Sequence, residues 1–516
     1  MRKPSKRCVP TSYRKLRTAR ARRHLLDFIK FTMPEYLAGW FAEELCWKLE
    51  IFLEQSIAGL SPRLIVMAPP RHGKSQIVSR HFPAFGLGKY PDMSFIATSY
   101  ASDLASSMNR DVQRVIDSDE YHILFPATTL WGKNIRTVAD GSYLRNSDIF
   151  EIVNRKGVYK SAGVGAGVTG RGGHVLLIDD PIKDDEEAHS EVVREKIWNW
   201  FTSTLSSRQA PGAGIVLIMT RWHEDDLAGR LIARMKNGGE HWDILCFPAI
   251  AEHDEYSVKD GRLLRREGEA LHPERYTLDM LLRIKMGTED ETGCGSRVWN
   301  SLYQQRPSAA EGNIFNKTWW KFLRPHKQPI DMGPSERKAY FRELGILRII
   351  QRFDTALGEK KQNDYTSCVT LGIARNRYYV IDVWKDKIQF PEVKKTVQLM
   401  FDRWHPSRVY IEGGGSASGK ATVQAMKRDS RVPIFETITS TDKVLRADTV
   451  SPSCESGFVT ILEGGEWCQG FIDSCAKFPN AKNDDDVDAF IGAMEVAIHK
   501  GAGMHISDDF LTAIGA

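Results

Sequence analysis

One stretch decides how the first half of the chain folds: Leu64-Ile65-Val66-Met67-Ala68-Pro69-Pro70-Arg71-His72-Gly73-Lys74-Ser75. Its apolar start predicts a buried strand, and a loop ending in Gly-Lys-Ser follows directly. In a phosphate-binding loop, glycine lets backbone amides approach phosphate oxygens, lysine reaches the β and γ phosphates, and the hydroxyl is a ligand of Mg²⁺. Ala68 stands where the usual pattern has its first glycine. The stretch therefore predicts a strand, a nucleotide-binding loop and a following helix, with these binding residues: Pro70, Arg71, His72, Gly73, Lys74 and Ser75.

A second apolar run, residues 175–178, ends in the paired acids Asp179 and Asp180. A strand that ends in carboxylates beside a phosphate loop holds the Mg²⁺ of the nucleotide and orients a water molecule. We assign Asp179 to the metal and Asp180 to the general base. This base is usually a glutamate, so Glu186 and Glu187 are substitutes for Asp180. The alternative is that an aspartate at a strand end only caps the next helix.

Three further side chains are candidates for contact with the γ-phosphate. Thr220 follows a third apolar run, residues 215–219, where its hydroxyl could report hydrolysis. Arg71 lies inside the phosphate loop, and Arg171 lies among glycines in Gly170-Arg171-Gly172-Gly173. Guanidinium groups at such places neutralise charge in the transition state. The glycines around Arg171 fit a finger that acts in trans on the nucleotide of a neighbouring subunit, although most arginines only solvate a surface.

Short apolar runs alternate with helical stretches throughout residues 61–305. Apolar runs of four or five residues between helices are typical of strands covered on both faces, so they predict a mostly parallel α/β sheet. Two more runs join the three above, at residues 95–97 and 244–247. Residues 25–60, which precede the first strand, are helical in pattern and rich in aromatic side chains.

A different pattern begins at residue 346. Three strand candidates are joined by turns too short for a helical crossover, so they should pair antiparallel. They are residues 348–356, 366–374 and 378–384. A predicted helix over 391–404 and a strand over 408–412 follow. Between the two halves, residues 306–345 carry prolines and many charges without clear periodicity, which predicts a linker.

Acidic residues of the second half form another candidate site. Asp354 lies in an apolar strand, where a charged group is costly unless it is paired or metal-bound. Glu412 ends a later strand, and Asp485 and Asp488 share one face at the start of a helix, just after Asp484. Acids that converge from two strands and a helix can hold two Mg²⁺ or Mn²⁺ ions ~3.5 to 4 Å apart and cut a phosphodiester bond. The alternative for the helix is that its acids only complement the helix dipole.

The net charge is distributed unevenly. Ten of the 71 Lys and Arg residues lie within residues 1–23, which hold none of the 66 Asp and Glu residues, so the remainder carries five more acids than bases. Such an arm either contacts phosphate groups or an acidic partner, or is a solvated tail. No apolar run approaches the ~18 residues needed to cross a bilayer. The eight cysteines show no metal-ligand spacing, so we expect a soluble intracellular protein with reduced thiols.

Together these motifs resemble those of the large terminase subunit of tailed bacteriophages, the motor that packages DNA into a capsid. The resemblance covers nearly the whole chain, and it rests on the order and spacing of motifs that are weak one by one. They are Pro69 to Ser75, Gly170-Arg171-Gly172, Leu177-Ile178-Asp179-Asp180-Pro181, Thr220-Arg221-Trp222, Tyr303-Gln304-Gln305-Arg306-Pro307, and the acids Asp354, Glu412 and 484–488, with Lys443 and Arg446 before the last acids. Asn483 stands where the family often has a histidine.

The resemblance implies an α/β fold with an N-terminal P-loop ATPase domain of the ASCE type around a mostly parallel sheet, and a C-terminal RNase H-like nuclease domain with a mixed sheet. We place a basic flexible arm at 1–24, a helical lid segment at 25–60, the ATPase domain at 61–305, the linker at 306–345, the nuclease domain at 346–505 and a tail at 506–516. The implied cofactors are ATP with Mg²⁺ at Ser75 and Asp179, and two Mg²⁺ or Mn²⁺ ions at the nuclease acids.

The resemblance also implies ATP-driven translocation of double-stranded viral DNA into the procapsid and metal-dependent cleavage of concatemeric DNA. The implied partners are double-stranded DNA, the portal protein, the small terminase subunit and further copies of the chain in a ring on the procapsid. The free chain would be a monomer in the host bacterial cytoplasm, bound to no membrane, transiently at the portal vertex and absent from the mature virion. Two alternatives stay open from the residues alone: a helicase-nuclease of recombination or repair, and a nucleotide-gated scaffold that does not cleave.

Overall fold

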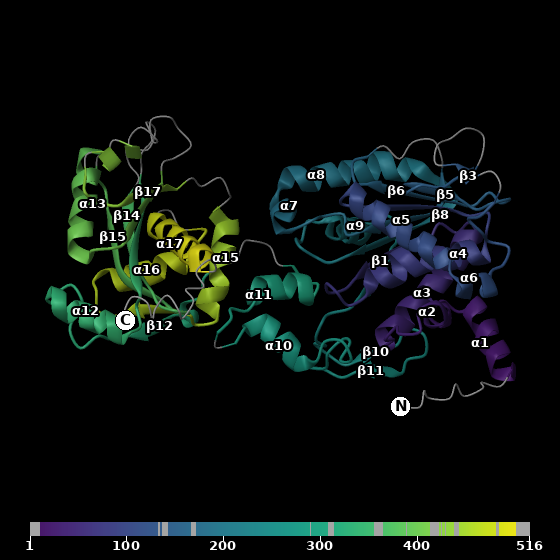
Figure 1. Ribbon diagram of the computed structural model, residues 1–516, viewed down its shortest axis with the longest axis horizontal. Helices are drawn as coiled ribbons and strands as arrows, with labels where there is room; N and C mark the ends of the chain where they lie inside the picture. The colour runs from purple at the N-terminus through teal and green to yellow at the C-terminus, as the bar shows by residue number, and fades with distance from the viewer. Residues whose placement is uncertain are drawn as a thin grey trace, which may run out of the picture. The chain divides into compact units, whose positions relative to one another are not determined.

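The computed structural model describes residues 11–132, 135–136, 143–166, 172–288, 290–307, 314–355, 365–388, 390–412, 423–424, 426–428, 430–437, 443–480 and 484–501. The chain forms two compact units (Figure 1). Unit 1 comprises Met1–Leu282 and Arg297–Ala309, and unit 2 comprises Arg283–Ser296 and Ala310–Ala516. The chain therefore crosses between the units three times.

Seven strands of unit 1 form one sheet in the order β5-β6-β2-β7-β8-β1-β9. Neighbouring strands are parallel except β5 and β6, which confirms the predicted mostly parallel sheet. The strands are β1 (Arg63–Met67), β2 (Ser94–Ser99), β5 (Ile149–Glu151), β6 (Val158–Gly163), β7 (Gly173–Asp179), β8 (Gln209–Met219) and β9 (Asp243–Cys246). Because β8 lies between β1 and β7, the phosphate loop, Thr220 and Asp179 follow or end three adjacent strands.

Both faces of this sheet are covered, which explains why its central strands β1, β7 and β8 contain continuous apolar runs. Leu64 and Val66 pack with α2, α3 and α4 on one face, whereas Ile65 and Met67 pack with α8, η2 and α9 on the other. The helices are α2 (Leu25–Thr32), α3 (Trp40–Ile57), the π-helical η1 (Gln76–His81) and η2 (Trp200–Leu205), α4 (Phe82–Lys89), α5 (Ser102–Ile116), α6 (Asp119–Leu124), α7 (Asp185–His189), α8 (Glu191–Asn199), η3 (Ser206–Arg208) and α9 (Leu227–Lys236). The helical prediction for residues 25–60 is confirmed by α2 and α3.

The remaining elements between residues 135 and 303 are short. They are β3 (Ile135–Arg136), β4 (Tyr143–Leu144), β10 (Glu255–Tyr256), β11 (Leu263–Arg265), α10 (Leu278–Met286), α11 (Gly295–Val298) and η4 (Trp299–Tyr303). β3 and β4 pair in parallel, and β10 and β11 pair antiparallel. The chain passes between units 1 and 2 within α10 and again within α11.

The basic N-terminal stretch differs from the flexible arm expected from its charge. Residues Thr11–Arg23 form the helix α1. Ala21 is fully buried, and Arg22 donates to the carbonyl groups of Leu124 and Ile123 at 2.8 and 2.9 Å. These carbonyls belong to the last turn of α6, where no backbone N–H group of the same helix is available to donate to them. The prediction of a flexible arm is therefore wrong for residues 11–23, while residues 1–10 lie outside the described part.

Seven strands of unit 2 form a mixed sheet in the order β12-β18-β15-β14-β13-β16-β17. The strands are β12 (Lys321–Leu323), β13 (Arg348–Asp354), β14 (Thr366–Ile373), β15 (Tyr378–Asp386), β16 (Arg408–Glu412), β17 (Ile434–Thr437) and β18 (Val459–Leu462). β14 pairs antiparallel with both β13 and β15, as predicted from the short turns. The remaining neighbours are parallel, so the predicted mixed sheet is confirmed.

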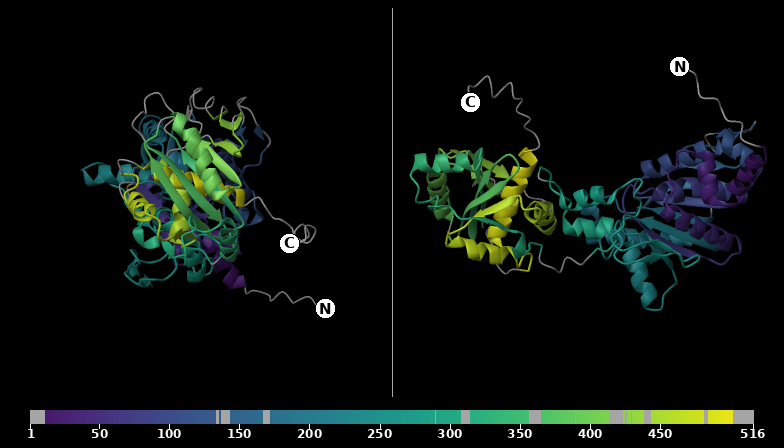
Figure 2. Two further views of the ribbon diagram at one scale, coloured as in Figure 1. Left: turned by 90° about the vertical axis from the view of Figure 1, so that its left-hand side faces the viewer. Right: turned by 90° about the horizontal axis from the view of Figure 1, so that it is seen from below.

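Helices cover both faces of the second sheet (Figure 2). Ile350 and Tyr410 pack with α15, α16 and α17 on one face, and Phe353 and Ile411 pack with α13 on the other. The helical elements are η5 (Lys317–Trp319), α12 (Pro334–Glu343), α13 (Phe390–Trp404), α15 (Lys443–Glu455), α16 (Trp467–Cys475) and α17 (Asp485–Gly501). The face with α17 is the one that carries the candidate nuclease acids.

The linker predicted for residues 306–345 is wrong for the described residues 314–345, which are part of unit 2. β12 is an edge strand that pairs with β18, and Phe315 and Trp320 are buried in the same core as α17. The prediction failed because β12 is only three residues long, which is too short for a periodic pattern to be recognised.

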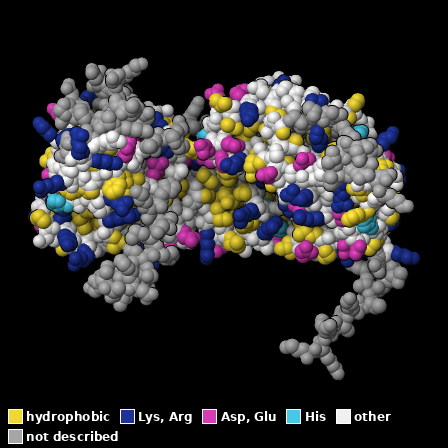
Figure 3. All heavy atoms as spheres, turned by 45° about the horizontal axis from the view of Figure 1, so that its top comes forward, with side chains coloured by type: hydrophobic (Ala, Val, Ile, Leu, Met, Phe, Trp, Pro, Cys, Tyr) yellow, Lys and Arg dark blue, Asp and Glu magenta, His cyan; other side chains and the backbone are white. Residues whose placement is uncertain are grey.

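The surface is mixed in charge. On the face shown in Figure 3, Lys and Arg side chains are interspersed with Asp and Glu side chains over both units. Within the described residues, no helix is both long and apolar enough to cross a membrane.

Candidate nucleotide and nuclease sites

The loop after β1 makes its sharp turn at Arg71 and Gly73. Their φ angles are 61° and 93°, in the left-handed region that glycine tolerates best. Ala68 is fully buried and is not among the described residues with positive φ. Position 68 therefore does not need a glycine, and the departure from the usual phosphate-loop pattern leaves the turn at Gly73 intact.

Lys74 joins the ends of two neighbouring strands to the loop. Its ammonium donates to Thr220 Oγ1 at 2.6 Å and pairs with Asp180 Oδ2 at 3.2 Å. The backbone N–H of Thr220 in turn donates to Asp180 Oδ1 at 2.7 Å. Thr220 Oγ1 donates to the carbonyl of Ala68 at 3.3 Å. Three predicted residues from separate parts of the sequence thus meet around one buried positive charge.

Asp179 accepts hydrogen bonds from two hydroxyl groups of the loop and the following helix. Ser75 Oγ lies 3.1 Å from Oδ1, and Ser79 Oγ lies 2.5 Å from Oδ2. Burial and the neighbouring Asp180 raise the pKa of Asp179, while Ser79, Lys74 and Ser75 lower it. A buried carboxylate beside a serine hydroxyl is an oxygen donor set that suits Mg²⁺. Ser79, which the sequence prediction omitted, lies one helical turn after Ser75.

The other predicted ATPase residues are placed as follows. Glu186 is exposed in the first turn of α7, and Glu187 accepts a hydrogen bond from the backbone N–H of Lys183 at 3.1 Å. Neither glutamate lines the cavity beside the phosphate loop, whereas Asp180 does. Arg171 lies outside the described residues.

The phosphate loop borders a cavity of about 750 Å³, a size typical of small-molecule sites. Of the residues predicted for the ATPase site, Pro70, Arg71, Gly73, Lys74, Ser75, Asp180 and Thr220 line it, whereas His72 and Asp179 do not. The segment between α2 and α3 adds Tyr36, and the region after β11 adds Arg275 and Tyr276. No recognised motif marks these three residues, so sequence reasoning missed them.

Tyr276 and Arg275 reach the phosphate loop from more than 200 residues later in the chain. The ring of Tyr276 stacks on His72, with centroids 4.7 Å apart and planes at 21°. A Cβ atom placed on Gly73 would lie 3.2 Å from Arg275 Nη1. Burial lowers the pKa of His72 to about 4, so this ring is neutral at pH 7. The short distance from Gly73 places the guanidinium of Arg275 beside the backbone that is expected to bind phosphate.

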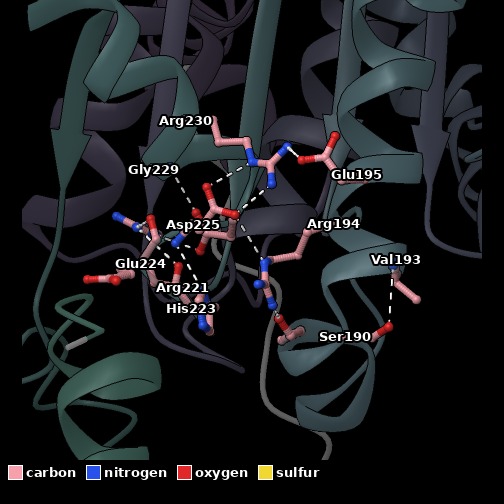
Figure 4. A network of polar contacts seen from close by, with 12 residues as sticks. Ser190, Val193, Arg194, Glu195, Arg221, His223, Glu224, Asp225, Gly229 and Arg230 are labelled. Carbon is pink, nitrogen blue, oxygen red and sulfur yellow. Dashed lines mark hydrogen bonds and ion pairs between the residues drawn. The ribbon is translucent and has the colours of Figure 1, made fainter. Parts of the chain in front are cut away.

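The loop after Thr220 is held by a network of ion pairs (Figure 4). Asp225 accepts from Arg230 Nη2 at 2.6 Å and from Arg194 Nε at 3.2 Å. Arg230 also pairs with Glu195 at 2.7 Å, and buried Arg221 donates to Asp226 at 2.8 Å. These contacts tie α8 and α9 to the loop, so the network supports the backbone that presents Thr220.

In unit 2 the sheet brings two predicted acids together. β13 and β16 are parallel, with Phe353 opposite Ile411, so Asp354 and Glu412 are the next residues of adjacent strands. Burial, Asp488 and Glu412 raise the pKa of Asp354 to about 7. The parallel register therefore places Asp354 and Glu412 on the same face of neighbouring strands.

The helix α17 contributes the remaining predicted acids. Asp488 Oδ1 is buried without a hydrogen-bond partner in the described structure, and burial together with Asp484 raises the pKa of Asp488 to about 6. Asp485 also raises the pKa of Asp354, whereas Asp484 pairs with Lys443. Within the described residues, no three of these groups already form a metal-binding cluster. The unpartnered oxygen of Asp488 and the mutual repulsion nevertheless fit acids that accept a cation.

Basic side chains surround these acids. Lys385 pairs with Asp486 at 2.7 Å and lies 3.7 Å from Asp485. Arg446 binds Glu495 at 2.8 Å, and Arg352 binds Glu412 at 2.8 Å. Sequence reasoning included Arg446 but missed Lys385 and Arg352, because no spacing rule connects them to the acids.

Two family models match the chain. A model described as "Terminase large subunit, T4likevirus-type, N-terminal" matches residues 65–321, and one described as "Terminase RNaseH-like domain" matches residues 351–496. A comparison with curated proteins gives no match.

Solved structures of similar proteins include a large terminase from a thermophilic bacteriophage, at 10% identity, TM-score 0.46, covering 86% of this chain and 98% of that chain. The HK97 bacteriophage large terminase matches at 10% identity and TM-score 0.35, covering 92% of this chain and 99% of that chain. The large terminase nuclease from the thermophilic phage G20c matches at 9% identity and TM-score 0.25, covering 35% of this chain and 96% of that chain. With the two family models spanning both units in order, the chain belongs to the terminase large subunit family, the ATPase and nuclease of viral DNA packaging.

Proposed function

We propose that ATP binds with its phosphates along Gly73, Lys74 and Ser75 and that one Mg²⁺ is held by Ser75 and Asp179. The convergence of Lys74, Thr220 and Asp180 on adjacent strand ends carries this proposal. A bound Mg²⁺ would neutralise phosphate charge during transfer to water. The described residues fit this ion, because Asp179 is buried and accepts hydrogen bonds from hydroxyl groups of the loop and of η1.

Asp180 is the general base in this proposal, in preference to Glu186. Its two oxygens are held by the Thr220 backbone N–H and the Lys74 ammonium. When the Lys74 ammonium turns to the phosphates, Asp180 Oδ2 becomes available to orient a water molecule. Thr220 would lose its hydrogen bond from Lys74 when the ammonium binds phosphate, and nucleotide binding would in this way be coupled to the end of β8. Arg71 lines the same cavity and is a candidate for neutralising transition-state charge, while Arg171 from a neighbouring subunit is the second candidate.

The test of the ATPase site is a Lys74→Ala protein. Loss of the ammonium removes the contact with the β and γ phosphates, so we expect ATP hydrolysis to fall to background in a phosphate-release assay. Lys89→Ala is the matched control, because Lys89 pairs with Glu54 on another surface of unit 1. Hydrolysis at the normal rate by Lys74→Ala would contradict the assignment.

For the nuclease, we propose that two Mg²⁺ or Mn²⁺ ions bind among Asp354, Glu412 and Asp488, with Asp485 or Asp484 as a further ligand. The raised pKa of Asp354 and the unpartnered oxygen of Asp488 support this site. Two ions would stabilise the attacking and leaving oxygens of the phosphodiester. The protein's own part is to hold the acids on β13, β16 and α17 at one end of the sheet.

Plasmid cleavage by the full chain tests this second site. We expect cleavage with Mg²⁺ or Mn²⁺, none with EDTA, and none from Asp354→Ala with either metal. Asp473→Ala is the control, since Asp473 of α16 is 40% exposed and pairs with Lys317 of η5. Intact metal-dependent cleavage by Asp354→Ala would place the nuclease site elsewhere.

We also propose that hydrolysis moves double-stranded viral DNA through a ring of these subunits docked on the portal protein, with a small terminase subunit recognising the DNA. The free chain would be a monomer in the host bacterial cytoplasm, would reach the portal vertex only during packaging and would be absent from the mature virion. The membership in the family supports these partners. Packaging of DNA into purified procapsids, followed by crosslinking of the chain to the portal, tests them together.

A further inference from the structure

Arg352 is a fully buried arginine on the strand that carries Asp354. Its side chain is 2% exposed, and the two residues lie two positions apart on β13, so their side chains leave the same face of the sheet. This is the face covered by α17. Burying a guanidinium is unfavourable unless a carboxylate balances its charge and acceptors bind its N–H groups. The partners of Arg352 therefore indicate its role.

The guanidinium of Arg352 is paired with a carboxylate. Nη2 donates to Glu412 Oε2 at 2.8 Å, and Nη1 donates to the carbonyl of Phe353 at 3.2 Å. Nε is buried without a hydrogen-bond partner in the described structure. Glu412 is the last residue of β16 and its side chain is 27% exposed, so the buried guanidinium of Arg352 restrains a carboxylate that solvent can partly reach.

A missing side chain on α17 makes room for this arginine. A Cβ atom added to Gly492 would lie 2.5 Å from Arg352 Nε and 3.3 Å from its Cγ and Cζ. Gly492 lies one helical turn after Asp488, on the same face of the helix. The helix thus contributes acids at positions 485 and 488 and an open slot at 492, and the guanidinium fills that slot.

We propose that Arg352 is a positioning residue of the nuclease: it holds Glu412 by one carboxylate oxygen and so leaves the other oxygen for a divalent cation. The inference rests on the nuclease site proposed above and adds a residue that does not itself contact metal or DNA. Outer partners of this kind orient metal ligands, and their loss typically weakens metal binding about 10- to 100-fold.

The alternative role, a purely electrostatic one, predicts an effect of opposite sign. A positive charge near a cation site repels the cation, so removing Arg352 would tighten metal binding if its charge alone mattered. If Arg352 acts by positioning Glu412, removing it weakens binding, because the carboxylate is no longer held. The direction of the change in Kd therefore separates the two roles.

Calorimetric titration of Mn²⁺ into the full chain without nucleotide measures this Kd. The heat that disappears in Asp354→Asn defines the nuclease component. We expect Arg352→Met to raise its Kd about 10- to 100-fold, and Arg352→Gln, which keeps an N–H donor, to lose less. An Arg352→Met protein that binds Mn²⁺ as tightly as wild type, or more tightly, would overturn the inference. Absence of any Asp354-dependent heat in wild type would instead reject the nuclease site itself.

A second variant tests the slot without changing any charge. Gly492→Ala displaces the guanidinium, so we expect it to weaken Mn²⁺ binding in the same direction as Arg352→Met. Gly470→Ala on α16 is the control, because an added Cβ there meets nothing within 4 Å. If Arg352→Met fails to fold, Gly492→Ala decides the question alone.

The double variant Arg352→Met/Gly492→Ala separates packing from positioning. It should be more thermally stable than Gly492→Ala, because the added methyl group no longer meets the guanidinium, but its affinity for Mn²⁺ should stay low. Recovery of both stability and affinity would show that the arginine acts only by packing and would overturn the inference.

Discussion

The Lys74 ammonium lies 2.6 Å from the hydroxyl of Thr220, so a side-chain hydrogen bond joins the lysine of the phosphate loop to the residue that follows β8. In the proposed ATPase site, a nucleotide phosphate that drew Lys74 away would break this bond, and the γ-phosphate would then affect the position of Thr220 at the end of β8. The contact also identifies Thr220 as the residue to test for coupling between binding and hydrolysis.

Thr220→Val should lower kcat for ATP hydrolysis about 10- to 100-fold, because a hydrogen bond to a charged group contributes about 1.5 to 3 kcal/mol. KM should change little, since Lys74 keeps its own contact with phosphate. Steady-state kinetics checks this. Thr98→Val is the matched control: Thr98 is also buried and donates to the carbonyl of Leu177 at 3.1 Å on the neighbouring strand. An unchanged kcat in Thr220→Val would remove the residue from the mechanism.

Arg275→Ala should raise KM for ATP about tenfold, the effect of losing roughly 1.4 kcal/mol of binding. The reason is the position of its guanidinium beside Gly73 in the same cavity. Arg262→Ala serves as the control, because Arg262 is exposed and pairs with Glu43. Nucleotide binding measured by fluorescence gives the Kd directly, and equal affinities of the two variants would exclude Arg275 from the site.

Without divalent cations, the contribution of the nuclease acids to stability should fall as pH rises from about 4 to about 7. Burial, Asp488 and Glu412 raise the pKa of Asp354 from 3.8 to about 7. The folded state therefore keeps a proton that the unfolded state loses in this window, and stability decreases with pH wherever the folded state binds more protons. The pKa of Asp488 is also raised, to about 6, so Asp488 adds to the decrease of stability with rising pH.

Thermal unfolding of the full chain in EDTA measures this effect at pH 5 and pH 7.5. We expect the Tm difference between the two pH values to shrink in Asp354→Asn, which has no proton to lose. Mn²⁺ should shrink it in wild type as well, because the cation replaces the proton. A pH dependence identical in wild type and Asp354→Asn would show that Asp354 has no raised pKa.

Arg22→Ala should destabilise unit 1 by about 1 kcal/mol, because it removes a charged donor from the C-terminal carbonyls of α6. Tm in a scanning calorimeter should drop by a few degrees. Arg23→Ala, the adjacent and exposed arginine, should leave Tm unchanged. If both variants behave alike, α1 is not held through Arg22.

Several central strands, among them β1, β7 and β8, were predictable because burial on two faces leaves a continuous apolar run. Leu64 to Met67 alternate between two cores, yet every position is apolar, and this is visible without knowing the partners. The phosphate loop, Asp179 and Thr220 were predictable for a related reason: each follows or ends such a run, and parallel strands bring these ends to one edge.

The contacts between distant residues were not predictable in the same way. Arg275 meets Gly73, and Arg352 meets Gly492, across sequence separations that carry no periodic pattern. The helix α1 was missed because its charge suggested solvation, whereas the burial of Ala21 and the carbonyls of α6 decide its conformation. β12 was missed because a three-residue edge strand is specified by its neighbour β18 rather than by its own sequence.

The three crossings of the chain between the units have a consequence for dissecting the protein. Residues 283–296 belong to unit 2 although they precede the last segment of unit 1. Ser296 is anchored there: its backbone N–H donates to Glu455 at 2.8 Å, and Ser456 donates to the carbonyl of Met286 at 3.2 Å. An engineered protease site within residues 308–313 would thus yield two fragments that stay associated on a sizing column. A fragment that starts at residue 346 would lack both residues 283–296 and β12, so the nuclease half cannot be obtained intact by a single cut.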